Sequence, residues 1–118
     1  MLSLPLPVRI FLCSRPADMR KSFDGLAALV REFLGADPLS GHLFVFRSKR
    51  GDRLKMLYWL GDGLAIWYRR LEQGTFRFPE APAGDGLEIS AVDLAMLLDG
   101  IDLDSVQRQE RYRRPQPA

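Results

Sequence analysis

Apolar and polar positions recur along this chain at two periods, and the change between them marks the predicted elements. Val8 to Cys13 is a short apolar run that predicts a first strand. Between Met19 and Phe33 apolar residues return every three or four positions with charged residues between them, which predicts an amphipathic helix. Asp18 and Ser14 are alternative caps for its start, and Gly35 predicts its end.

Three apolar runs of similar length follow the predicted helix, at Leu43 to Arg47, Arg53 to Leu60 and Leu64 to Leu71. The segments between them contain Gly and Asp, the residues that favour tight turns. We therefore predict a meander of three antiparallel strands.

The last third of the chain alternates short extended and helical patterns. Thr75 to Phe78 predicts a further extended piece at an edge of the sheet, and Leu87 to Ile89 a short strand. Ser90 predicts the cap of a second helix over Ala91 to Asp99, which a glycine follows. Together these elements predict an α+β fold, with a single mainly antiparallel sheet of about four to six strands and both helices packed on one face.

Size and composition agree with one small domain. The chain has 118 residues, of which 47% are hydrophobic, enough for a core. We expect a single globular domain over residues 1–103 and a basic, flexible tail over 104–118. A single cysteine, Cys13, cannot form an internal disulfide, which fits a reducing cytoplasm. The first residues contain no basic leader and no apolar run long enough for a membrane span, so we expect neither export nor membrane insertion.

Charge is strongly segregated, although the formal net charge is only +2. Residues 47–77 contain eight Arg or Lys against three acidic residues, a net charge of +5. Residues 80–104 contain seven acidic residues and no Arg or Lys, a net charge of −7. The acidic segment is suited to a basic protein partner, or is simply the solvated side of the second helix.

Residues for catalysis are scarce. His42 is the only histidine, so a site with two histidine ligands cannot be formed, and nothing in the sequence completes a catalytic triad around it. The simplest interpretation is that His42 lies in a turn before a strand. The glycines of Gly61 to Gly63 lack the following Lys and Ser or Thr of a phosphate-binding loop. We therefore expect no catalytic residue, no metal and no cofactor.

The positive charges of the predicted meander are the best candidates for a binding site, because cations beside aromatic rings on a half-exposed sheet suit a polyanion. Six contacts to DNA phosphates would make the slope of log K against log salt about −5, at roughly −0.9 per contact. The alternative is that the hairpin cations only keep the turn soluble and protect an edge strand. Trp59 and Trp67 are stacking platforms or core residues, and strand alternation favours the core. The candidate contacts are Lys49, Arg50, Arg53, Lys55, Arg69 and Arg70.

Three blocks of this sequence, Asp18 to Val30, Gly41 to Trp59 and Trp67 to Pro79, resemble the TnpB accessory proteins of the insertion sequence 66 family. The resemblance implies a small bacterial protein encoded by a mobile element beside a separate, larger transposase, with no catalytic residue assigned. This chain departs from the pattern at Leu60, where we expect an acidic residue in many relatives. The residues that carry the resemblance are Asp18, Met19, Arg20, Lys21, Phe46, Lys55, Trp59, Arg70, Leu71, Gly74, Phe76 and Pro79.

The leading hypothesis from the sequence is a non-enzymatic accessory protein for transposition. It would bind DNA through the positive charges of the predicted meander and contact the transposase or another protein of the same element through a different face. We expect it in the bacterial cytoplasm, at the nucleoid if it binds DNA. The alternative is a protein-interaction module of the transposition complex with no nucleic-acid contact. A nuclease or phosphoryl-transfer subunit is a third class, which would require a clustered pair of carboxylates.

Overall fold

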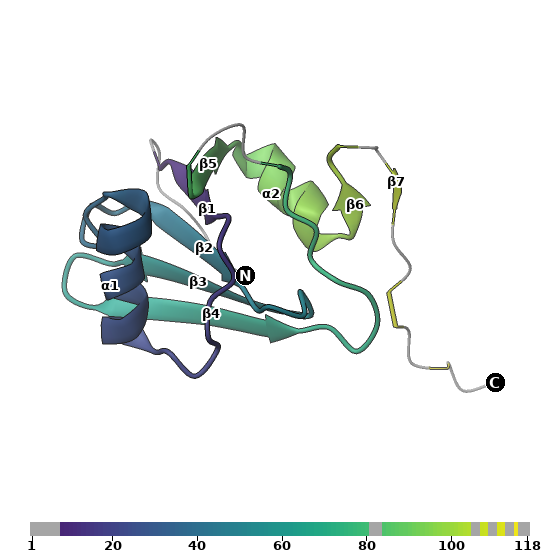
Figure 1. Cartoon of the computed structure of the whole chain (residues 1–118), viewed down its shortest axis with the longest axis horizontal. Helices are drawn as coiled ribbons and strands as arrows, with labels where there is room; N and C mark the ends of the chain where they lie inside the picture. The colour runs from purple at the N-terminus through teal and green to yellow at the C-terminus, as the bar shows by residue number, and fades with distance from the viewer. Residues whose placement is uncertain (1–7, 81–83, 105–106, 109–110, 113–114, 116–118) are drawn as a thin grey trace.

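The computed structural model describes residues 8–80, 84–104, 107–108, 111–112 and 115. Five strands form one sheet in the order β4-β3-β2-β1-β5, and a two-stranded ladder of β6 and β7 follows it (Figure 1). This is an α+β fold, as predicted. In chain order the elements are β1 (Ile10–Cys13), α1 (Phe23–Leu34), β2 (Leu43–Arg47), β3 (Arg53–Trp59), β4 (Leu64–Arg70), β5 (Gly86–Ile89), α2 (Ala91–Leu98), β6 (Ile101–Asp102) and β7 (Gln107–Arg108).

The predicted meander is confirmed: β2, β3 and β4 are consecutive antiparallel strands, with Phe44 opposite Leu57 and Leu57 opposite Ile66. Strand β1 lies parallel to β2, because α1 supplies the crossover that a parallel pair requires. Strand β5 then pairs antiparallel with β1 and forms one edge of the sheet. Strand β4 forms the other edge.

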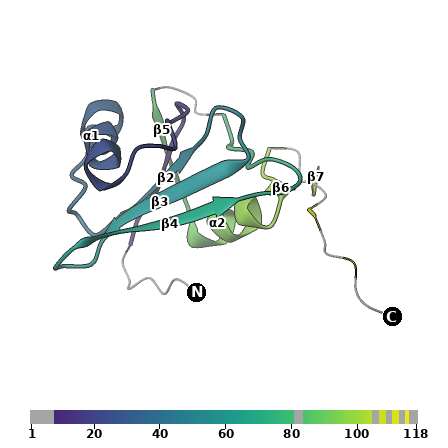
Figure 2. The same cartoon turned by 90° about the horizontal axis from the view of Figure 1, so that it is seen from below.

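The two helices cover opposite faces of the sheet, and the prediction that both lie on one face is wrong. Helix α1 packs on the face that contains Phe44 and Phe46, whereas α2 packs on the face that contains Leu43 and Val45. Figure 2 shows the sheet between them. All four residues are fully buried, so both faces of β2 are apolar and each requires a covering layer.

Helix α1 begins at Phe23, later than either predicted start. The carbonyl groups of Met19 and Lys21 accept hydrogen bonds from Lys55 Nζ, both at 2.8 Å. Those carbonyls belong to the segment that would form the first turn of a longer helix, so the contact holds it in a separate turn. The helix ends as predicted at Gly35, whose φ of 57° is left-handed.

Residues 75–78 do not form a strand, contrary to the prediction. The Phe76 side chain is fully buried in the core on the α2 side, and its N–H donates to Gly51 O at 2.7 Å. The segment therefore closes the end of the β2–β3 hairpin. The edges of the sheet are β4 and β5.

The last elements agree with the sequence pattern. Strand β5 covers the predicted Leu87 to Ile89, and Ser90 Oγ accepts from Asp93 N at 3.0 Å as the cap of α2. The predicted tail includes residues 105–106, 109–110, 113–114 and 116–118, which lie outside the described residues. Of its described residues, Gln107 and Arg108 pair with β6, and Arg111 Nη2 donates to Thr75 O at 3.3 Å. In the part of the chain that the structure describes, we find no helix with the length and apolarity of a membrane span.

Candidate nucleic-acid interface

The turn between β2 and β3 presents two cations to solvent. Lys49 and Arg50 are exposed at its tip. The turn is fixed from below by Ser48, whose side chain is almost fully buried: Ser48 Oγ accepts from Arg53 N at 3.1 Å and donates to Asp52 Oδ1 at 3.2 Å. The positive charges therefore project from a turn held by its own hydrogen bonds.

Two further cations continue this charge along the sheet. Arg53 begins β3, and the strand register places it directly opposite Arg70 at the end of β4. Arg53 Nη1 donates to Tyr68 Oη at 3.5 Å, while Arg70 pairs with Glu72 at 3.0 Å. Like charges opposite each other in an antiparallel pair repel, and a bound anion would relieve that repulsion.

Two open hollows share Arg53 and connect these four side chains, which we call the cationic face: Lys49, Arg50, Arg53 and Arg70. One hollow is lined by Arg53, Tyr68, Arg70 and Glu72. The other is lined by Asp18, Met19, Ser48, Lys49, Arg50, Asp52 and Arg53. The structure thus brings four of the six candidate residues together.

Lys55 is not part of the cationic face. Its side chain is buried, with 8% of the residue exposed, and its Nζ donates to the carbonyls of Met19 and Lys21 and lies 4.7 Å from the centre of the Tyr68 ring. A phosphate cannot reach this ammonium group without displacing the segment that covers it. A signal was visible in the sequence, because Lys55 stands between Leu54 and Met56 in an apolar strand.

Arg69 also lies apart, because strand alternation turns it to the α2 face. Its Nη1 donates to Leu98 O at 3.3 Å, and its guanidinium lies 6.0 Å from the centre of the Phe76 ring. Leu98 is the last residue of α2, so Arg69 satisfies a carbonyl at the negative end of that helix. Its role is to stabilise α2.

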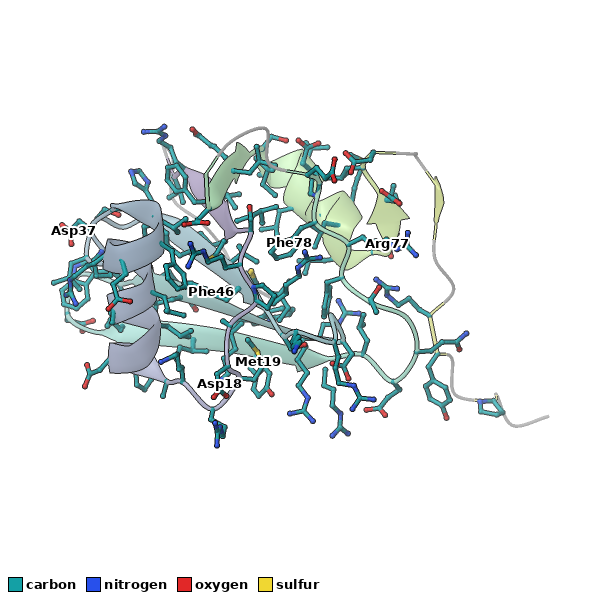
Figure 3. The ribbon with its side chains drawn as sticks, viewed as in Figure 1. Asp18, Met19, Asp37, Phe46, Arg77 and Phe78 are labelled. Carbon is teal, nitrogen blue, oxygen red and sulfur yellow. The ribbon has the colours of Figure 1, made fainter. Side chains whose placement is uncertain are left out.

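The residues of the family resemblance mainly build the fold. Asp18 accepts from Arg20 Nη2 at 2.7 Å and from the backbone N–H of Arg20 at 2.9 Å, which lowers the pKa of Asp18 to about 2. Figure 3 shows Asp18 and Met19 on the segment that leads into α1. Phe46, on β2, is fully buried on the face of the sheet that α1 covers. The Lys21 side chain is exposed, and only its backbone carbonyl is used, as the acceptor of the hydrogen bond from Lys55 Nζ.

The remaining residues of that pattern lie at the other end of the sheet or along it. Gly74 adopts a φ of 86°, and Leu71 N donates to Asp52 O at 2.8 Å, so this segment turns back on the β2–β3 hairpin. Trp67 is half-buried against the core on the α2 side, in agreement with the expectation of a core residue. Of the residues that carry the family resemblance, Leu71 and Phe76 are buried, and Trp59 and Pro79 are half-buried.

The acidic segment is partly neutralised by arginines from distant parts of the sequence, a feature that charge counting missed. Arg77 is exposed but lies near α2, away from the cationic face, and Figure 3 shows it there beside Phe78. Glu88 has a lowered pKa because the Arg9 guanidinium donates to its carboxylate. The ion pairs are Arg9–Glu88 at 2.6 Å, Arg15–Asp85 at 2.9 Å and Arg77–Asp102 at 3.5 Å.

Other candidate chemistry has structural explanations. His42 Nδ1 accepts from Arg9 N at 3.0 Å, directly before β2, in the place expected from the sequence. Cys13 is buried, and burial raises the pKa of its thiol. Among the described residues no group of three His, Cys, Asp or Glu side chains is placed to hold a metal ion.

Comparison with known proteins shows which family this chain matches. The family model described as "IS66 Orf2 like protein" matches residues 8–108. The uncharacterized protein y4jC of Sinorhizobium fredii (strain NBRC 101917 / NGR234) is 43% identical over 109 residues, which cover 92% of this chain and 91% of that protein. The uncharacterized protein y4hO of the same strain is 41% identical over 95 residues, covering 80% and 82%. No solved structure matches the chain significantly.

Proposed function

Because the chain belongs to the IS66 Orf2-like family, we propose that it is a non-catalytic accessory protein of DNA transposition that binds DNA phosphates through its cationic face. The observation that carries the proposal is the convergence of Lys49, Arg50, Arg53 and Arg70 around two connected hollows. Phosphate contacts of this kind position a protein on DNA and do not read its sequence.

The hairpin tip is the strongest part of this surface. Among the described residues, no carboxylate lies within ion-pair distance of Lys49 or Arg50, so both charges remain available to a polyanion. Arg70 is partly offset by Glu72, and Arg53 already donates to the Tyr68 hydroxyl. We therefore assign the main contact to Lys49, Arg50 and Arg53, with Arg70 beside them.

For contact with the transposase we propose the outer side of α2. Val92 is 68% exposed there, and Ala91 and Ala95 are exposed beside it. Helix α1, in contrast, presents charged residues such as Arg31 and Glu32 to solvent. An exposed apolar strip suits a protein partner better than it suits DNA.

Charge reversal at the hairpin tip tests the DNA contact. Arg50→Glu should weaken binding of labelled double-stranded DNA about tenfold or more at low salt, measured by fluorescence anisotropy. Arg31→Glu is the matched control: it makes the same charge change on an exposed residue in the last turn of α1 and should change binding little. Equal effects of the two changes would mean that net charge, and not this surface, governs binding.

The same experiment separates the alternative, a module that contacts only protein. If wild-type protein gives no anisotropy change with DNA yet co-purifies with the transposase after nuclease treatment, the protein-interaction function is correct. Loss of that co-purification in Val92→Asp, with Arg50→Glu unaffected, would place the contact on α2.

A further inference from the structure

Strand β4, one of the two edge strands of the sheet, has the features of an edge that pairs with a further strand. It runs for seven residues, Leu64–Arg70, and its first five are apolar or aromatic. None of the seven is buried, whereas four of the seven residues of the neighbouring β3 are. In Figure 1 β4 lies along the lower border of the sheet. Long apolar edge strands of this kind readily pair with another strand.

The hydrogen-bond pattern shows which backbone groups of β4 face outward. Leu60 N donates to Gly63 O at 2.9 Å at one end of the β3–β4 pair, and Leu71 N donates to Asp52 O at 2.8 Å at the other. Because hydrogen-bonded and non-bonded pairs alternate in an antiparallel ladder, the odd-numbered residues of β4 bond to β3. The even-numbered residues, Leu64, Ile66, Tyr68 and Arg70, direct their N–H and C=O groups away from the sheet.

We propose that this edge binds β4 of a second copy of the same chain, in an antiparallel pair centred on Ile66. The two sheets then become one continuous sheet with a two-fold axis. Leu64 of each chain lies opposite Tyr68 of the other, and both pairs use the outward backbone groups. This inference does not depend on DNA binding.

Side chains on both faces of this pair are complementary. On the α2 face the small Ala65 lies opposite the large Trp67 of the second copy, twice. On the α1 face Ile66 meets Ile66. In this register the end of β4 that contains Arg70 meets the turn before β4 of the second copy, which contains Asp62, an exposed carboxylate with no ion pair among the described residues. Opposite charges at facing positions stabilise a strand pair.

Neighbouring registers are less favourable. One shifted register still pairs outward-facing backbone groups and sets Arg70 opposite Leu64 of the second copy. It also brings Asp62 towards Glu72 of the second copy, so that two carboxylates approach each other. The shift in the other direction carries Arg70 past the start of β4, because the chain turns back into β3 there, with Leu60 N donating to Gly63 O. Only the register centred on Ile66 pairs each Arg70 with an acidic residue, which is why a second copy fits this edge better than an arbitrary extended peptide.

The first test uses proline, which removes a backbone donor. Ile66→Pro deletes an outward N–H that is not used in the pair with β3 and that faces no other strand among the described residues, so the monomer should keep its circular dichroism spectrum. Dimerisation, measured by analytical ultracentrifugation across a concentration series, should weaken by about tenfold or more. The control Ile66→Val keeps the donor and should leave the dimer intact. A wild-type chain that stays monomeric at every concentration overturns the proposal.

The second test does not depend on whether the proline variant folds. Asp62→Arg alone and Arg70→Asp alone each set like charges against each other in the dimer, so each should dimerise more weakly, by about tenfold. Mixing the two variants restores both opposite-charge pairs, and the mixed dimer should regain wild-type affinity. Failure of mixing to restore the dimer overturns the proposed register, as does pairing of this edge with a different protein in preference to a second copy.

Discussion

Lys55 shows how one buried charge connects three parts of the fold. Its ammonium group on β3 holds the segment before α1 through two carbonyls and lies against the Tyr68 ring of β4. A buried ammonium is stable only when its donors are satisfied, and backbone carbonyls here serve where a carboxylate usually would. Lys55 therefore stabilises the fold, and it is not one of the DNA contacts that we propose.

Replacing Lys55 by Met should destabilise the protein by about 2 kcal/mol, because the carbonyls of Met19 and Lys21 lose their donor. Urea unfolding followed by tryptophan fluorescence measures the change. Arg53→Met is the control on the same strand and face: its side chain is exposed, and we expect a change within about 0.5 kcal/mol. Equal losses for both variants would contradict a structural role specific to Lys55.

Asp18 gives the protein a defined response to acid. Its pKa in the folded chain is about 2, lowered mainly by the side-chain hydrogen bond from Arg20, whereas an unfolded Asp has a pKa of about 4. A carboxylate with a lowered folded pKa contributes stability above its unfolded pKa, and that contribution is lost as the pH falls through about 2.

Asp18→Asn removes this contribution, so the melting temperatures of wild type and variant should differ at about pH 5 and converge towards about pH 2. Thermal unfolding followed by circular dichroism checks this. Glu88 also has a lowered pKa because of Arg9, so the variant should keep a part of the acid sensitivity. A difference that stays constant over the whole pH range would contradict the assignment.

At the scale of elements, the two helices begin in different ways. Ser90 caps α2 through its side chain, with Oγ accepting from Asp93 N at 3.0 Å. Ser22 occupies the same position before α1 but makes no side-chain capping bond. Helix α1 is instead positioned by the Lys55 contact that precedes it and by its buried apolar side.

Ser90→Ala should therefore destabilise the protein by about 1 kcal/mol, the usual loss for a capping bond. Ser22→Ala is the matched control, and we expect a change close to zero. Both are measured by chemical denaturation. A loss for Ser22→Ala as large as that for Ser90→Ala would mean that the first helix also depends on a side-chain cap.

On the scale of the whole molecule, the distribution of charge decides how the protein should respond to salt. The four residues of the cationic face, each releasing about 0.9 counterions, predict a slope of log K against log salt of roughly −3.6. All six contacts predicted from the sequence would give about −5. A salt series of DNA-binding measurements distinguishes the two values, and a slope near zero would exclude phosphate contact.

The sequence predicted the elements well where local rules apply. The meander, the short strand before Ser90 and the end of α1 at Gly35 all follow from periodicity and from turn or capping residues a few positions apart. The start of α1 was predicted wrongly, because its true position depends on Lys55, 36 residues from Met19. The pattern of β2, apolar at four consecutive positions, could have indicated that both faces of the sheet are covered.

Residue types read in order predicted both helices, strands β1 to β5 and the family, because periodicity and motifs are properties of the sequence. They predicted residues 75–78 wrongly as a strand, because the fully buried Phe76 packs into the core there instead. Which charges remain free follows instead from the packing of the fold. Arg9 meets Glu88 across 79 positions, and strand alternation sends Arg69 and Arg70 to opposite faces. A charged side chain pairs with whatever lies within a few ångströms, and that neighbour is set by how strands and helices pack, not by their order in the chain.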